Sequence, residues 1–357
     1  MGKRLVLLCD GTWNRPENMD RRKRKPTNIM KLVRAIKPLT ADGTVQVTYY
    51  DEGVGNNWGL DRILGGGFGV GLSRNILEAY RFLLYNYAPG DTIFFFGFSR
   101  GAYTVRSLAG FIQHLGLLPK EHDFYAPEAY ELYRQRPPKG QDQTRWRQEI
   151  DQFRTAHKSQ QVGISFLGVW DTVGALGVPS SLFTLFNHRR YQFHDASLCA
   201  CIQHAYQALA VDEKRRTFRP TLWEDVATHQ VLEQRWFAGV HTNVGGGYEK
   251  DGLANIPLHW LKDKAAALGL DVDESFLKYY RPWFGDQLRD SMTWYYRLLG
   301  TQIREIGVGR GSNETIDESV LKRMSFPEAA YQPANVLTAL RRPEFSHLAS
   351  AAKPATV

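Results

Sequence analysis

The sequence predicts an α/β protein with a mainly parallel central sheet that has helices on both faces. Two observations carry this prediction. From Leu5 to Ile112, short apolar runs alternate with segments whose apolar residues recur at helical spacing, which is typical of parallel strands joined by right-handed crossovers. In addition, the run from Ile93 to Phe96 is continuously apolar, as expected for a central strand that is buried on both faces.

The elements follow one another in a regular order along the chain. Strands are expected, in order, over residues 5–9, 45–50, 93–96, 164–170 and 236–240. Helices are expected after a cap at Thr27 or Asn28, around 76–84, over 102–112 and near 199–209.

Residues 1–270 are expected to form the α/β domain that carries the site. Within it, the polar segment 120–160 is expected to be an insertion that acts as a lid. Residues 271–357 contain aromatic-rich pieces and several prolines, and they are expected to form a helical or irregular appendage packed on the core.

Composition places the chain among folded proteins, since 43% of its 357 residues are hydrophobic. The three cysteines, Cys9, Cys199 and Cys201, lack the spacing of a disulfide framework or a zinc site, and no metal or other cofactor is expected. No apolar run approaches the length of about 20 residues that spans a bilayer. The N-terminal MGKRLVLLCDG is interpreted as the first strand and not as a signal peptide, so we expect synthesis in the cytoplasm.

The formal net charge is +8, and a local excess of positive charge lies in the run from Arg21 to Lys25. Such a run is usually a solvated loop. The alternative is peripheral contact with an anionic surface, either a phospholipid headgroup layer or another polyanion. A nucleic acid partner is not expected.

The segment Gly97-Phe98-Ser99-Arg100-Gly101 joins a predicted buried strand to a predicted helix. A serine at such a turn, with glycine two residues before and after it, is typical of a nucleophile elbow. The elbow holds the serine in a strained backbone conformation and exposes its hydroxyl at a helix N-terminus. The alternative interpretation is an ordinary strand-to-helix turn that contains a small residue.

A serine hydroxyl needs a base, and the base must be held by a third group. Asp171 ends the apolar strand GISFLGVWD, and His241 ends RWFAGVH, in the order Ser, Asp, His. His241 is preferred to the other histidines because it follows an apolar strand and precedes a glycine cluster, although a histidine there can be a satisfied polar group. Asp171 can instead cap the residues after it, and Asp212 in ALAVDE is the rival acid.

The expected oxyanion donors are the backbone N–H groups of Arg100 and of Gly11 or Thr12. Asp10 ends the first strand and therefore opens onto the same edge of the sheet. It is expected to hold the loop after it in shape, and the alternative is that it helps to bind a cation.

Nine segments support a family resemblance. They are CDGTWN (9–14), TNIMKL (27–32), YYDEGVG (49–55), GFSRGAYTVRSLAG (97–110), GVWDTVGALG (168–177), ALAVDEKR (208–215), WFAGVHTNVGGGY (236–248), LANIPLHWL (253–261) and ESVLKRM (318–324). Together they resemble the uncharacterised α/β-hydrolase domain family that includes the first group of type VI secretion lipase effectors.

The resemblance implies an α/β-hydrolase core with Ser99, Asp171 and His241 as a triad that cleaves carboxylic esters, with phospholipid acyl esters as substrates of the characterised branch. It also implies export by a specialised secretion system. Two other functions are weighed against this one. They are a binding module that keeps the scaffold without catalysis, and a metal-assisted phosphoesterase that uses Asp10, Asp171 and His241.

Overall fold

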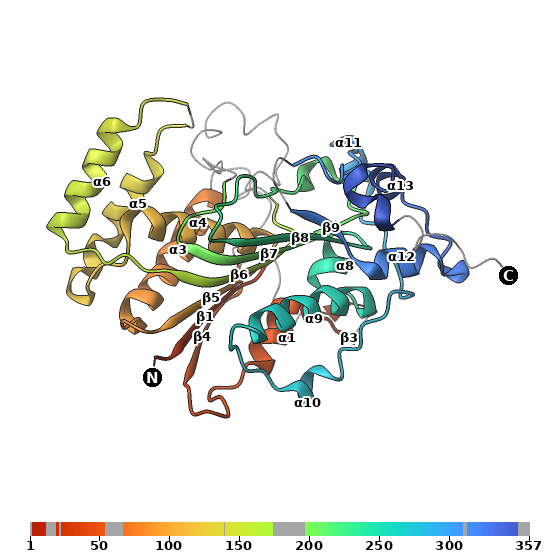
Figure 1. Ribbon diagram of the computed structural model, residues 1–357, viewed down its shortest axis with the longest axis horizontal. Coiled ribbons are helices and arrows are strands. Elements are labelled where there is room, and N and C mark those ends of the chain that lie inside the picture. Colours follow the sequence, from red (N-terminus) through yellow and green to blue (C-terminus); the bar gives the residue numbers. More distant parts are fainter. Residues whose placement is uncertain are drawn as a thin grey trace.

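The computed structural model describes residues 2–11, 19–20, 23–53, 67–138, 140–173, 197–309 and 313–348. Its centre is a sheet of seven strands in the order β4-β1-β5-β6-β7-β8-β9, and each neighbouring pair in it is parallel (Figure 1). The strands are β1 (Arg4–Cys9), β4 (Gln46–Asp51), β5 (Thr92–Phe98), β6 (Ile164–Trp170), β7 (Ile202–Ala210), β8 (Val231–Phe237) and β9 (Glu314–Ile316). The predicted α/β class is confirmed.

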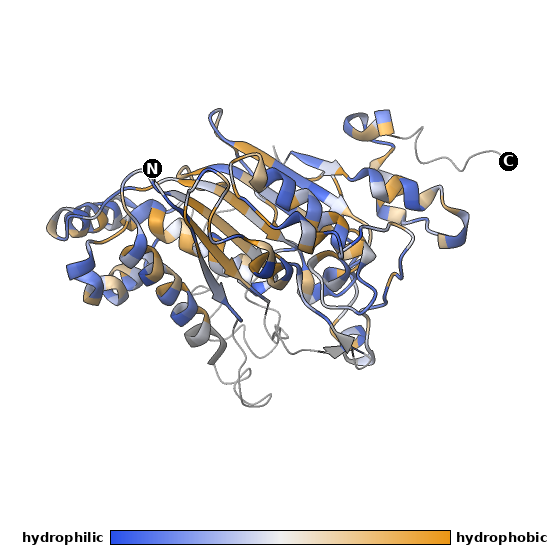
Figure 2. Ribbon diagram, turned by 90° about the horizontal axis from the view of Figure 1, so that it is seen from below, coloured by the Kyte–Doolittle hydropathy of each residue, from blue (hydrophilic) through white to orange (hydrophobic). Residues whose placement is uncertain are grey.

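Side chains alternate along the buried strands, so both faces of the sheet carry apolar residues. Helices cover both faces and bury these residues. In β1, Leu5 and Leu7 face the cluster that contains α3 (Gly67–Asn86) and α4 (Arg100–Leu115). Val6 and Leu8 face the opposite cluster, which contains α1 (Asn28–Ala35) and α9 (Gly252–Ala266). Figure 2 shows the central strands as largely hydrophobic and the outer helices as mixed. The core therefore consists of two apolar layers separated by the sheet.

The predicted cap of α1 is present, because the Thr27 side chain accepts a hydrogen bond from the Met30 backbone N–H. The predicted helix near 199–209 is wrong. This segment is β7, which pairs with β6 on one side and β8 on the other. Its alanines favour a helix, but pairing with strands along both edges in a buried position outweighs that intrinsic preference.

The segment 120–160 forms η1 (Lys120–Tyr125), α5 (Ala126–Arg134) and α6 (Thr144–Ala156). Its aromatic rings pack on the C-terminal half of α4, where Tyr130 meets Phe111 and Trp146 meets His114. Ser99 precedes the other end of α4, about 24 Å away along a helix of 16 residues. The role of this segment as a lid stays a prediction from sequence.

The segment after residue 270 packs on the core as expected, through a third apolar cluster that includes Val320 and Val336. It contains α10 (Glu274–Leu277), α11 (Trp294–Leu298), α12 (Glu318–Met324) and α13 (Ala334–Ala339), followed by η4 (Pro343–Leu348). It also supplies β9, which pairs with β8 at the edge of the sheet. The C-terminal segment is thus continuous with the sheet.

A two-stranded antiparallel ribbon, β2 (Met19–Asp20) and β3 (Lys23–Arg24), lies outside the main sheet. Arg21 and Arg22 of the basic run fall between β2 and β3 in the sequence and lie outside the described residues. Thr12 lies outside them as well. In the described parts of the chain, no helix is both long enough and apolar enough to cross a membrane.

Candidate active site

Ser99 lies at the junction between β5 and α4, and its backbone is in an unusual conformation. Its φ is 56° and its ψ is −117°, a region that residues other than glycine rarely adopt. The turn is tight, because a Cβ at position 97 would lie 2.5 Å from Ala102 Cα and a Cβ at position 101 would collide with the carbonyl oxygen of Cys9. Only glycine fits at positions 97 and 101 without displacing backbone. Ser99 therefore lies in a tight strand-to-helix turn with a strained backbone.

Asp171 and His241 meet at the carboxyl edge of the sheet. Asp171 directly follows β6, and His241 is the first residue of α8 (His241–Gly245), four residues beyond the end of β8. Nδ1 of His241 lies 2.6 Å from Oδ2 of Asp171, and both side chains are buried. Asp171 itself has a φ of 42°, a second strained residue at this edge. The carboxylate is placed to fix the tautomer and orientation of the imidazole.

The imidazole of His241 lies beside the elbow. Its ring stacks on Phe98, the residue before Ser99, with 4.8 Å between the ring centroids, and Phe218 packs against it edge-on at 5.0 Å. Nδ1 contacts Asp171, so Nε2 is the nitrogen left for proton transfer. Among the contacts of the described residues, no hydrogen bond joins Nε2 to Ser99 Oγ. Such bonds often form only when substrate is bound.

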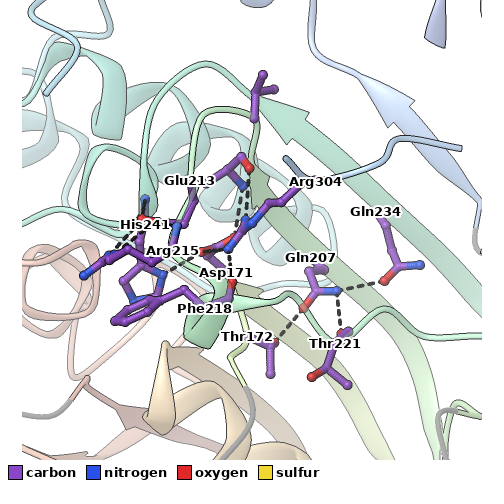
Figure 3. Close-up of polar contacts among 12 residues, drawn as sticks. Asp171, Thr172, Gln207, Glu213, Arg215, Phe218, Thr221, Gln234, His241 and Arg304 are labelled. Atoms are coloured by element: carbon purple, nitrogen blue, oxygen red, sulfur yellow. Dashed lines mark hydrogen bonds and ion pairs between the residues drawn. The ribbon is translucent and has the colours of Figure 1, made fainter. Parts of the chain in front are cut away.

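Arg304 forms an ion pair with the carboxylate of Asp171, the same carboxylate that the imidazole contacts (Figure 3). Its two terminal nitrogens lie 2.5 Å from Oδ1 and 3.0 Å from Oδ2 of Asp171. The same nitrogens donate to the carbonyl oxygens of Ala210 and Phe218. Asp171 also accepts a hydrogen bond from the Ala210 N–H, so both carboxylate oxygens are well satisfied. This bidentate pair fixes the carboxylate plane.

The electrostatics of the pair follow from these contacts. Burial alone would raise the pKa of Asp171, but the Arg304 guanidinium and the hydrogen bond from His241 hold that pKa well below its usual range. Burial lowers the pKa of His241, and this effect outweighs the hydrogen bond and charge of Asp171, which raise it. At neutral pH the site thus holds an ionised Asp171, a cationic Arg304 and a neutral imidazole that can accept a proton.

A polar cluster next to Asp171 links the residue Thr172, just after β6, to the middle of β7 and of β8. Thr172 donates to Gln207 Oε1 at 2.6 Å, and Gln207 Nε2 donates to Gln234 Oε1 at 2.8 Å (Figure 3). Gln234 in turn bonds the backbone of Trp223. Each amide in this buried cluster has partners, so it can set the register of β7 and β8 without an unpaired polar group.

The sequence left the choice between two acids, Asp171 and Asp212, open. In the structure, His241 contacts Asp171 and not Asp212. Asp212 accepts hydrogen bonds from the Gly239 N–H and the Tyr331 hydroxyl. Burial raises the pKa of Asp212, and the charges of Arg323 and Lys214 only partly offset this effect. Among the described residues, no lysine or arginine forms an ion pair with Asp212 like that of Arg304 with Asp171. Asp212 therefore ties the loop after β8 to the C-terminal segment.

Sequence reasoning missed two residues of this site, Glu213 and Arg304. Glu213 is buried, accepts two hydrogen bonds from the Arg215 guanidinium and one from the Arg215 backbone N–H, and accepts another from the backbone N–H of His241 at 3.2 Å. A carboxylate at this position stabilises the start of α8, and thus the position of His241. Glu213 directly follows Asp212 in ALAVDE. The segment was therefore already marked by Asp212 as one that could supply an acid to the site. Arg304 has no local signal in the sequence.

Asp10 connects the end of β1 to Thr27, the residue that caps α1. Its Oδ1 accepts from the Gly11 N–H at 2.7 Å and its Oδ2 accepts from the Thr27 hydroxyl at 2.5 Å. The Gly11 N–H therefore points to Asp10 in this structure. Arg100 is the first residue of α4, where backbone N–H groups lack an intrahelical acceptor. Thr12, the other expected donor, lies outside the described residues.

The arrangement offers little to a metal ion. Asp10 and Asp171 direct their carboxylate oxygens to protein donors. Across the described ranges, no three His, Cys, Asp or Glu side chains are grouped so that they could hold a metal.

Comparison with known proteins gives one family and three relatives. The chain matches the family model of the type VI secretion system phospholipase effector Tle1-like catalytic domain over residues 3–264. The uncharacterized protein YEL023C of Saccharomyces cerevisiae is 29% identical over 237 residues, which are 61% of this chain and 32% of that protein.

Two solved structures are also similar. An uncharacterized protein from Pseudomonas aeruginosa is 16% identical, with a TM-score of 0.46 over 80% of this chain and 49% of that one. The Tle1 effector bound to the VgrG spike of the type 6 secretion system is 19% identical, with a TM-score of 0.37 over 70% of this chain and 52% of that one. The chain thus spans about a third of the yeast relative and about half of each solved chain.

The parallel sheet, with the candidate site at the carboxyl ends of its strands, defines an α/β protein. Because the family model covers residues 3–264, the chain belongs to the Tle1-like phospholipase effector catalytic domain family. The resemblance that the sequence motifs indicated is confirmed.

Proposed function

We propose that this protein hydrolyses carboxylic esters of lipids by a serine mechanism. The single observation that carries the proposal is the buried His241–Asp171 pair beside a serine in the strained elbow conformation. Ser99 is the nucleophile, His241 is the general base and acid, and Asp171 orients the imidazole and stabilises its protonated form. Membership of a phospholipase effector family supports lipid esters as the substrate class.

The steps follow from these roles. Nε2 of His241 accepts the Ser99 proton while Oγ bonds to the ester carbonyl carbon, and the Arg100 N–H at the start of α4 stabilises the oxyanion. Collapse of the tetrahedral intermediate expels the alkoxide, which takes the proton from His241 and leaves an acyl-serine. A water molecule, deprotonated by His241, then attacks the acyl carbon and releases the acid and free Ser99. The second oxyanion donor is proposed to be Gly11 or Thr12, which requires the Gly11 N–H to exchange Asp10 for the substrate oxygen.

The substrate and the partners are proposed from the family. Cleavage of phospholipid acyl esters, a phospholipase A activity, is the specific form we propose, and export through a type VI secretion apparatus follows from the same family. Peripheral contact of Arg21–Lys25 with an anionic membrane stays a prediction from sequence.

The test is replacement of the nucleophile. Ser99→Ala should lower the turnover of short p-nitrophenyl esters by a factor on the order of 10⁴ or more while the circular dichroism spectrum stays unchanged. The wild-type protein should be labelled by a fluorophosphonate probe, and Ser99→Ala should not. Equal activity of the two proteins would remove Ser99 from the mechanism, and no labelling of the wild type would favour a binding module on the same scaffold.

A further inference from the structure

The surface next to His241 exposes large apolar side chains. Helix α11 presents Trp294, which is 76% exposed, and Leu298, which is 77% exposed. These residues are four apart and therefore lie on the same face of the helix. Ile303, five residues further on, is 57% exposed. We call Trp294, Leu298 and Ile303 the apolar rim.

Contacts connect the apolar rim to the candidate site. Tyr296 of α11 meets Phe218 edge-on, with 5.9 Å between the ring centroids, and Phe218 meets His241 at 5.0 Å. Tyr296 also lies close enough to Arg100, the residue after Ser99, to influence its pKa. One aromatic ring thus separates α11 from the imidazole, so the helix that carries two residues of the apolar rim packs close to the candidate site.

Positive charge surrounds the apolar rim. Backbone hydrogen bonds from Arg216 to Gly300 and from Gln302 to Lys214 hold the segment after β7 against the segment after α11. The exposed cations of these two segments are Lys214, Arg216, Arg219 and Arg297. The exposed acids beside them are Asp290, which lies 4.0 Å from Arg297, and Glu305. Cations therefore outnumber acids around an apolar centre, a pattern that suits an anionic lipid surface.

We propose that the apolar rim is the membrane-docking surface of this protein: Trp294, Leu298 and Ile303 enter the interface of an anionic phospholipid bilayer, and the surrounding cations contact its headgroups. Tryptophan suits this position because its ring is apolar and its indole N–H is polar. Docking there places the mouth of the site against the lipid surface, so an acyl ester reaches Ser99 without crossing bulk water. The choice of lipid as the occupant rests on the proposed function.

Vesicle binding tests the proposal apart from catalysis. The full chain carrying Ser99→Ala, which leaves the lipid intact, is sedimented with vesicles of phosphatidylcholine alone or mixed with phosphatidylglycerol. We expect binding to the mixed vesicles. Adding Trp294→Asp and Leu298→Asp should weaken it at least about tenfold, because two apolar side chains no longer leave water. Lys214→Gln and Arg297→Gln should each weaken it about fivefold at low salt.

Phe124→Asp is the matched control, since Phe124 is 64% exposed in η1, beyond the far end of α4. It should bind vesicles like the parent protein, and circular dichroism confirms that each variant is folded. The proposal is overturned if the Ser99→Ala protein does not bind the mixed vesicles, or if the Trp294→Asp and Leu298→Asp changes leave its binding unchanged. A protein partner would then be the better candidate for the occupant of the apolar rim. If Ser99→Ala keeps its esterase activity while docking behaves as expected, the proposed function fails and the docking surface stands.

Discussion

Arg304 offers the sharpest test of how the site sets the basicity of His241. In the variant Arg304→Gln, the carboxylate of Asp171 loses the cation that lies 2.5 and 3.0 Å from its oxygens. The full negative charge of Asp171 then acts on the imidazole, whose Nδ1 is 2.6 Å from Oδ2. The imidazolium becomes easier to form, so we expect the pKa of His241 to rise.

The structure gives the size of the effect. The Arg304 nitrogen and His241 Nδ1 both contact Oδ2 of Asp171, at 3.0 and 2.6 Å, so they lie at most about 5.6 Å apart. Two unit charges at that distance interact by about 3 kcal/mol at an effective dielectric constant of about 20. This energy corresponds to a pKa change of about two. The glutamine amide and water will replace part of the lost interaction. We therefore expect the pKa of His241 to rise by about one to two, which is about a ten- to hundredfold increase in its proton affinity.

The assay is the pH dependence of kcat/KM for a short p-nitrophenyl ester. Its acid limb reports protonation of the free enzyme's base, so the limb of Arg304→Gln should move to higher pH and activity in mild acid should fall. Removing one partner of a buried pair costs about 3–5 kcal/mol of stability, so folding is checked by thermal melting. Arg304→Lys keeps the charge and should keep the limb near its wild-type position, although the bidentate geometry is lost. A folded Arg304→Gln protein whose acid limb coincides with that of the wild type would refute the reasoning and leave Arg304 a structural role only.

Two further predictions concern stability. Gly101→Ala should lower the free energy of unfolding in urea by about 2 kcal/mol or more, because its Cβ would collide with the Cys9 carbonyl; Gly163→Ala, whose Cβ would have 3.8 Å to its nearest neighbour, is the matched control and should be tolerated. The lowered pKa of Asp171 stabilises the fold above the unfolded carboxyl pKa of about 3.9, and this contribution is lost as pH falls towards the lower folded value. The free energy of unfolding should therefore fall less steeply below about pH 4 in Asp171→Asn than in the wild type, and equal slopes would contradict the assignment.

The sequence predicted the elements whose physical signal is local. A continuous apolar run followed by G-x-S-x-G located β5 and the elbow, because strand burial and the glycine requirement are both written in adjacent residues. The capping threonine of α1 was equally local. The strand β7 was predicted as a helix, because its alanines and glutamines carry no strand signal of their own and only its neighbours β6 and β8 make it a strand.

The same contrast holds for the site. Asp171 and His241 were found because each follows an apolar strand, which parallel strands bring to one edge. The choice between Asp171 and Asp212 could not be made from sequence, since both acids follow strands and only the contact with His241 separates them. Arg304 lies 133 positions after Asp171, and no spacing rule connects an arginine in an irregular segment with a distant carboxylate.

Arg304 also bears on where the functional unit ends. The family model covers residues 3–264, yet the guanidinium that holds Asp171 and the edge strand β9 both come from beyond residue 270. A chain ended at residue 270 would leave the buried Asp171 carboxylate without the cation that contacts both its oxygens. The charge of Asp171 would then act on the imidazole alone, so the pKa of His241 should rise as it does in Arg304→Gln. The C-terminal segment is therefore expected to act on the chemistry at Ser99 through Asp171, although it lies outside the part of the chain that the family model matches.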